Sequence, residues 1–309
     1  MAHAFLLFLY TRIFVLVLLL LVAAAAVIAQ DDDDVVRVNT DLVVLNVTVT
    51  DKSGQYVRNL RASDFNVYED GKLVDPMMIA GFSMQESPYA AVVLLDSSGS
   101  MEARMALARS AAIRFLDGLR DEDVAAVFRF DSLVQKVQDF SGGRDLAPMA
   151  YAIRPKGMTT LNDAIVEAAR VLADRQEKRK AILVLSDGMD TFSKASPKKA
   201  VESALAIGAT IYAVDMSSLE LPGSPNRQSA MSLKGFAERT GGRFINTPGG
   251  PALRDAFSKI ADELGHQYTL AYRPANKAHD GKWRVLEVRM KDEGLHVRTR
   301  TGYRAPKDH

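Results

Sequence analysis

Residues 91–100 read AVVLLDSSGS, an apolar run that ends in a carboxylate, hydroxyls and a glycine. The apolar part has the length and composition of a buried strand. Asp96, Ser98 and Ser100 place oxygen side chains at alternate positions where this strand stops. Such a set can bind a hard cation such as Mg²⁺ without excess negative charge, and Gly99 lets the backbone turn sharply. Taken alone, the stretch is equally typical of a strand-to-helix connection capped by Ser100.

Two turns further along the chain also carry oxygen side chains. Residues 156–165 read KGMTTLNDAI, and residues 181–188 read AILVLSDG, a second apolar run that ends in an aspartate. In this order the three turns resemble the metal-ion-dependent adhesion site of von Willebrand factor type A domains, D-x-S-x-S followed by a threonine and an S/T-D-G turn. The resemblance assigns five residues to that site: Asp96, Ser98, Ser100, Thr159 and Asp187. Met158 stands where the family usually has a second glycine, which leaves Thr160 as the alternative to Thr159.

The resemblance implies a metal ion and a partner. The ion is expected to be Mg²⁺, with Mn²⁺ or Ca²⁺ as alternatives, because ligation by oxygen alone admits all three. The implied partner is a protein that contributes an acidic side chain to the open coordination position. Two neighbouring carboxylates are not expected to be ligands. Asp163 is interpreted as a first-turn acid of a helix, and Asp190 as a solvated loop acid.

Residues 89–264 alternate strand and helix patterns, which predicts an α/β fold of Rossmann-like type with a mainly parallel sheet flanked by helices. Strands are expected at 91–96, 124–130, 133–137, 181–185 and 210–214, with helices at 102–119, 161–172, 197–207, 228–239 and 252–264. In such sheets ligands bind at the carboxyl ends of the strands. This rule would bring Asp96 and Asp187 together.

The flanking regions, residues 36–86 and 266–305, show the alternation of β-strands. The expected strands are 43–50, a hairpin over 65–74 around Asp70-Gly71, and 79–84, followed by 267–274, 283–290 and 296–303. Because three short strands bury little alone, the two regions are expected to pair in one sandwich that flanks the α/β domain or has it inserted. The first region also resembles exported bacterial, Acidobacteria-type proteins related to von Willebrand factor A domains. Four arginines are expected on the solvated face: Arg284, Arg289, Arg298 and Arg300.

The N-terminus predicts export. Residues 1–29 have the apolar stretch of a signal peptide, with small residues before a cleavage site after Ala29, and residues 30–35 form an acidic linker. The alternative is an uncleaved membrane anchor, which would be the protein's contact with a membrane. The expected location is therefore the periplasm, the cell envelope or outside the cell. The chain has no cysteine, so it has neither a disulfide nor an N-terminal lipid attached through cysteine.

Composition and motifs exclude several function classes. The 39 basic and 38 acidic residues nearly cancel, which gives no indication of a nucleic-acid partner. The histidines lie outside residues 89–264, and no cysteine or Gly-x-Ser-x-Gly motif is present, so nucleophilic catalysis is not expected. The expected function is an exported, metal-dependent protein-binding or adhesion module that is not an enzyme. The alternatives are a structural envelope protein whose metal only stabilises the fold, and a Mg²⁺-dependent phosphohydrolase, although the latter class needs an aspartate at the position of Ser98.

Overall fold

The computed structural model describes residues 42–83, 87–187, 189–217, 226–246 and 250–307. The expected signal peptide, residues 1–29, and the acidic linker, residues 30–35, lie outside the described residues. Within the described ranges, no helix has both the length and the apolar character needed to cross a membrane.

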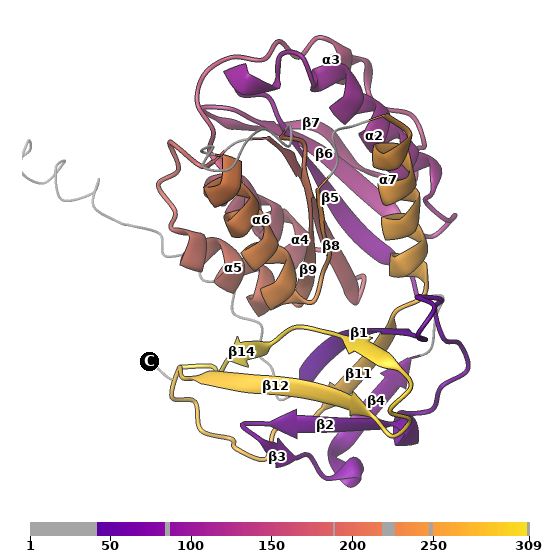
Figure 1. Cartoon of the computed structure of the whole chain (residues 1–309). Helices are drawn as coiled ribbons and strands as arrows, with labels where there is room; N and C mark the ends of the chain where they lie inside the picture. The colour runs from indigo at the N-terminus through magenta and orange to yellow at the C-terminus, as the bar shows by residue number, and fades with distance from the viewer. Residues whose placement is uncertain (1–41, 84–86, 188, 218–225, 247–249, 308–309) are drawn as a thin grey trace, which may run out of the picture. The chain divides into compact units, whose positions relative to one another are not determined.

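A six-stranded sheet forms the centre of the α/β part (Figure 1). Its strands, in spatial order, are β10 (Phe244–Asn246), β9 (Ala209–Asp215), β8 (Arg179–Ser186), β5 (Tyr89–Asp96), β6 (Val124–Phe130) and β7 (Val134–Ser141). All neighbours are parallel except β7, which runs antiparallel to β6. Every residue of β5 is buried, because this strand lies in the middle of the sheet and both of its faces are covered.

Helices cover both faces of this sheet. Ala91, Val93 and Leu95 of β5 pack in the core that includes α2 (Met105–Asp117) and α7 (Gly250–Gly265). The alternate residues of β5 pack in the core that includes α4 (Leu161–Ala173), α5 (Pro197–Ala206) and α6 (Asn226–Thr240). The predicted α/β fold is therefore confirmed. The helix expected from residue 102 begins at Met105, because a 3-10 turn at Gly99–Met101 (η3) comes first, and a short helix, α3 (Pro148–Tyr151), was not expected.

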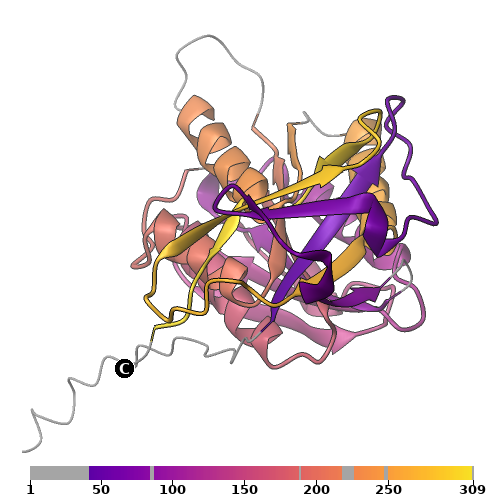
Figure 2. The ribbon, with the colours of Figure 1, turned by 90° about the horizontal axis from the view of Figure 1, so that it is seen from below.

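The strands before and after the α/β part build two antiparallel sheets (Figures 1 and 2). One sheet has the order β13 (His296–Arg298), β1 (Val43–Thr50), β11 (Tyr268–Tyr272) and β4 (Ile79–Ser83), and the other has β14 (Gly302–Arg304), β12 (Trp283–Met290), β2 (Phe65–Glu69) and β3 (Lys72–Leu73). A short 3-10 helix, η1 (Ala62–Asp64), precedes β2, and a second one, η2 (Pro76–Met78), precedes β4. Both sheets combine N-terminal and C-terminal strands around one apolar core, as expected. Asp70 and Gly71 turn the β2–β3 hairpin with φ of 50° and 78°.

The prediction of one strand over residues 296–303 is wrong. The chain instead forms β13, which pairs with β1, and β14, which pairs with β12 in the other sheet. Between them the Thr299 hydroxyl donates to the Asn46 carbonyl (2.8 Å), and Arg300 Nη1 donates to the Leu205 carbonyl on α5 (3.1 Å). These contacts take the chain from one sheet to the other, so a continuous ladder cannot form.

Most of the C-terminal arginines are not on a solvated face. The crossing between the sheets turns Arg298 and Arg300 toward the α/β part, and Arg284 lies on the buried face of β12 with Leu286, Val288 and Met290. Arg284 and Arg300 are buried, and Arg298 is partly buried against Glu263, whereas Arg289 lies outside and pairs with Glu287. Arg298 and Arg300 occupy alternate positions that face the α/β part rather than solvent. Alternation identified the strand but not what its polar side faces.

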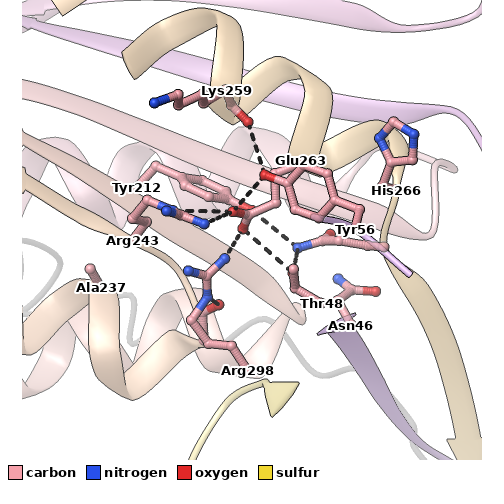
Figure 3. A network of polar contacts seen from close by, with 12 residues as sticks. Asn46, Thr48, Tyr56, Tyr212, Ala237, Arg243, Lys259, Glu263, His266 and Arg298 are labelled. Carbon is pink, nitrogen blue, oxygen red and sulfur yellow. Dashed lines mark hydrogen bonds and ion pairs between the residues drawn. The ribbon is translucent and has the colours of Figure 1, made fainter. Parts of the chain in front are cut away.

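A buried carboxylate joins the sandwich to the α/β part within the compact unit of residues 36–309 (Figure 3). Glu263 of α7 accepts hydrogen bonds from Tyr212 Oη of β9 (2.8 Å) and Arg243 Nη2 (3.0 Å), and forms an ion pair with Arg298 of β13. Burial, reinforced by the Glu263 charge, raises the pKa of Tyr212, which keeps its hydroxyl a donor. The side chain thus connects α7, the central sheet and the sandwich.

Candidate metal centre

Asp96 lies at the carboxyl end of the central strand β5, with no exposed surface. Its carboxylate accepts hydrogen bonds from the Ser98 backbone N–H (2.8 Å) and from the hydroxyl of Ser186 on the adjacent strand β8. Burial raises the pKa of Asp96 to about 6; the two serines oppose the rise, and the negative charge of Asp187 adds to it. The carboxylate is thus held in place at the edge of the sheet where β5 and β8 end.

Ser98 and Ser100 connect the end of β5 to the aspartate that follows β8. Their two hydroxyl oxygens lie 3.2 Å apart, and the Ser100 hydroxyl donates to Asp187 Oδ1 (2.7 Å). The other oxygen of Asp187 forms an ion pair with Arg104, which directly precedes α2. Residues 87 positions apart in the sequence therefore share one network, because β5 and β8 are parallel neighbours.

The loop before α4 lies against the Asp96 turn. Gly99 N–H donates to the Gly157 carbonyl (3.3 Å), and Lys156 N–H to the Ser97 carbonyl (2.9 Å). Gly157 has φ of +77°, and a Cβ there would lie 2.6 Å from Ser132 Oγ, so this position favours glycine on both counts. Met158, the next residue, does not have a positive φ, so a methionine can stand where the family usually has its second glycine.

The two neighbouring threonines differ in how their hydroxyls are used. The Thr160 hydroxyl donates to the Asp131 carbonyl (2.8 Å). Thr159 is also buried, but its hydroxyl has no hydrogen-bond partner among the residues described. Its backbone is fixed by N–H groups of Thr191 and Phe192, which donate to its carbonyl at 2.9 and 3.0 Å. Thr159 is therefore the threonine whose oxygen is available to a ligand.

Two other carboxylates next to the site hold a loop to α4. Asp190 accepts from the backbone N–H of Asn162 (2.7 Å), and Asp163 accepts from the N–H groups of Lys194 (3.0 Å) and Ala195 (2.8 Å). Asp190 is half-buried rather than the solvated acid that was expected. Both side chains are occupied by backbone groups.

The five residues assigned by the resemblance fit a hard cation. They provide two buried carboxylates, two hydroxyls in contact and one hydroxyl without a partner in the described chain, all donors that Mg²⁺ prefers. The described residues contain no group of three or more histidine, cysteine or acidic side chains arranged for a metal, so this site depends on its hydroxyls. Sequence reasoning missed Ser186 and Arg104. The signals available were the position of Ser186 directly before Asp187 and that of Arg104 four residues after Ser100.

Comparison with known proteins gives one family match. Residues 91–189 match the model of the von Willebrand factor type A domain. The comparison with curated proteins gives no match.

Three solved structures illustrate the structural similarity. The conserved hypothetical protein BatB from Bacteroides thetaiotaomicron is 17% identical, with a TM-score of 0.47 over 57% of this chain and 98% of that chain. The vWF domain of the type V pili tip protein Mfa5 from Porphyromonas gingivalis is 15% identical, with a TM-score of 0.48 over 59% and 96%. A von Willebrand factor type A protein from Catenulispora acidiphila is 14% identical, with a TM-score of 0.47 over 88% and 76%.

Proposed function

Residues 91–189 match the von Willebrand factor type A domain, and from this premise we propose that the protein is an exported, metal-dependent protein-binding or adhesion module. The observation that carries the proposal is the convergence of oxygen side chains from three loops at the ends of β5 and β8. Export is proposed from the sequence of residues 1–29. Under this proposal the protein is not an enzyme.

The residues of the centre have separable roles. Asp96 and Asp187 would supply two negative charges, and Ser98, Ser100 and Thr159 would supply neutral oxygens. A bound divalent cation would act as a Lewis acid that attracts an external carboxylate. Because Arg104 already balances part of the Asp187 charge, the occupied centre would keep a net positive charge. A partner's acidic side chain is the group that this charge favours.

Calorimetric titration with Mg²⁺ and Mn²⁺ tests the metal dependence. We expect saturable binding to the wild-type protein and none to Asp96→Ala. Asp139→Ala is the matched control, since Asp139 is an exposed carboxylate on β7 that pairs with Lys136. Circular dichroism establishes that each variant is folded. A folded wild-type protein that binds neither ion would overturn the proposal.

Water-proton relaxation separates adhesion from a purely structural metal. We expect Mn²⁺ bound to the protein to relax water strongly, because an open coordination position exchanges with solvent, and acetate to reduce this effect by occupying that position. Bound Mn²⁺ that does not relax water, together with a raised melting temperature, would instead support the structural alternative.

A further inference from the structure

Exposed apolar side chains lie on the loops next to the candidate metal centre. Four of them, Leu133, Met158, Met189 and Phe192, are here called the apolar rim. Met158 is 47% exposed and Phe192 is 53% exposed, although both are large apolar residues. From this surface we infer that the partner presents an acidic side chain flanked by apolar side chains. The inference deepens the proposed function and rests on it.

Backbone contacts place the rim beside the candidate ligands. Met158 directly precedes Thr159, and its N–H donates to Ser132 Oγ (3.1 Å), which puts Leu133 on the adjoining loop. Phe192 N–H donates to the Thr159 carbonyl (3.0 Å). Met189 follows Asp187 by two residues, so their Cα atoms lie at most about 7 Å apart. All four side chains therefore start within a few residues of the centre.

Exposed apolar side chains are concentrated near the candidate metal centre. Ten large hydrophobic residues are exposed among the described residues, and four of them lie on the short segments 131–133, 156–159 and 189–192. Single exposed apolar residues need no explanation, but a group around a polar centre is typical of a binding surface. Methionine and phenylalanine are also enriched at protein interfaces, where methionine adapts to varied partners.

The arrangement determines the chemistry of the occupant. With a divalent cation bound beside Arg104, the centre would select a carboxylate by charge. Apolar side chains on either side of that carboxylate would cover the rim and exclude water, which strengthens the ionic contact in the middle. A partner whose acid is flanked by charged or strongly polar side chains would leave the rim exposed and would desolvate its own polar groups without compensation. The surface therefore favours an acidic residue within an apolar segment.

A displayed library of random 12-residue peptides, selected on the whole protein in Mg²⁺, tests this inference. We expect the enriched sequences to place Asp or Glu next to Leu, Ile, Met or Phe. One enriched peptide is then measured by fluorescence anisotropy against Met158→Ser and Met189→Ser. Each rim variant is expected to weaken binding about tenfold, the effect of losing one well-packed apolar contact. Met77→Ser is the matched control, because Met77 is 91% exposed on the sandwich, outside the rim.

Repeating the measurement with a chelator and with Asp96→Ala separates the two claims. Peptide binding that needs Mg²⁺ but is unchanged in both rim variants would overturn the inference that the apolar rim binds the partner, and would leave the metal-dependent function intact. Binding that is lost in the rim variants but does not need Mg²⁺ would overturn the metal-dependent function. Acids flanked by polar residues, or a selection with no enriched sequence, would also overturn the inference, while calorimetry would still decide the metal site.

Discussion

Replacing Glu263 by alanine should destabilise the protein strongly. The carboxylate has no exposed surface, and it accepts hydrogen bonds from Tyr212 and Arg243 and pairs with Arg298. Its removal leaves two guanidinium groups without a counter-charge and the Tyr212 hydroxyl without its acceptor. Because these partners come from the central sheet and the sandwich, the damage falls on the contact between them (Figure 3).

The magnitude follows from burial. Removing one member of a buried ion pair costs about 3–5 kcal/mol. Arg243 and Arg298 keep 39% and 30% of their side-chain surface exposed, so water can partly solvate them. The lower end, about 3 kcal/mol, is therefore expected for Glu263→Ala. Glu263→Gln keeps an acceptor for Tyr212 and should lose about 2 kcal/mol, and Arg243→Met about 1 kcal/mol, because Glu263 retains Arg298.

Urea unfolding provides the assay. The only tryptophan of the chain, Trp283, lies on the sandwich strand β12, packs against the α/β core and lies under Arg239 of α6, so its fluorescence reports on the contact between the two parts. Circular dichroism at 222 nm reports on the helices of the α/β part. In the wild-type protein the two signals should change together, as expected for one cooperative unit. The free energy of unfolding should fall in the order wild type, Arg243→Met, Glu263→Gln and Glu263→Ala. A Glu263→Ala protein within about 1 kcal/mol of wild type would refute the reasoning.

Further predictions concern two glycines and the metal centre. Gly241→Ala should cost about 3 kcal/mol, because φ is +79° and a Cβ would lie 2.4 Å from the Thr299 backbone. Gly208→Ala should cost only about 1 kcal/mol, since φ is +68° but the space is open, and equal losses on urea unfolding would contradict this. Asp96, whose pKa is raised to about 6, must lose a proton to bind a cation, so calorimetry should show Mg²⁺ affinity about tenfold weaker at pH 5 than at pH 7.5, and a flat profile would argue against Asp96 as a ligand. In the metal-free protein the same carboxyl takes up a proton on folding between about pH 4 and 6, so its contribution to stability falls as the pH rises through that window. Arg104→Met removes the cation that pairs with Asp187 and should tighten Mg²⁺ binding about fivefold, whereas weaker binding would mean that Arg104 supports the site.

Local sequence signals were sufficient for most of the architecture. The apolar runs of β5 and β8 and the Asp70-Gly71 turn are short-range patterns, and they correspond to the strands and hairpin observed. The candidate site followed from the order of three loops. Their contact depends on β5 and β8 being parallel neighbours, which agrees with the general rule for α/β sheets.

The remaining features depend on contacts that the sequence does not display. The break between β13 and β14 arises where Arg300 reaches the Leu205 carbonyl on α5, almost a hundred residues earlier in the chain. Arg300 is buried because it lies at this break, whereas the burial of Arg284 could have been predicted, since Arg284 alternates in phase with the apolar residues Leu286, Val288 and Met290 of β12. The ion pair between Arg104 and Asp187 likewise depends on the fold, which brings together two loops that are far apart in the sequence.

Anomalous scattering from crystals of the protein grown with Mn²⁺ tests the central claim most directly. The account predicts one strong peak bounded by oxygens of Asp96, Ser98, Ser100, Thr159 and Asp187. A peak at Asp163 or Asp190, or no peak at a saturating Mn²⁺ concentration, would contradict it.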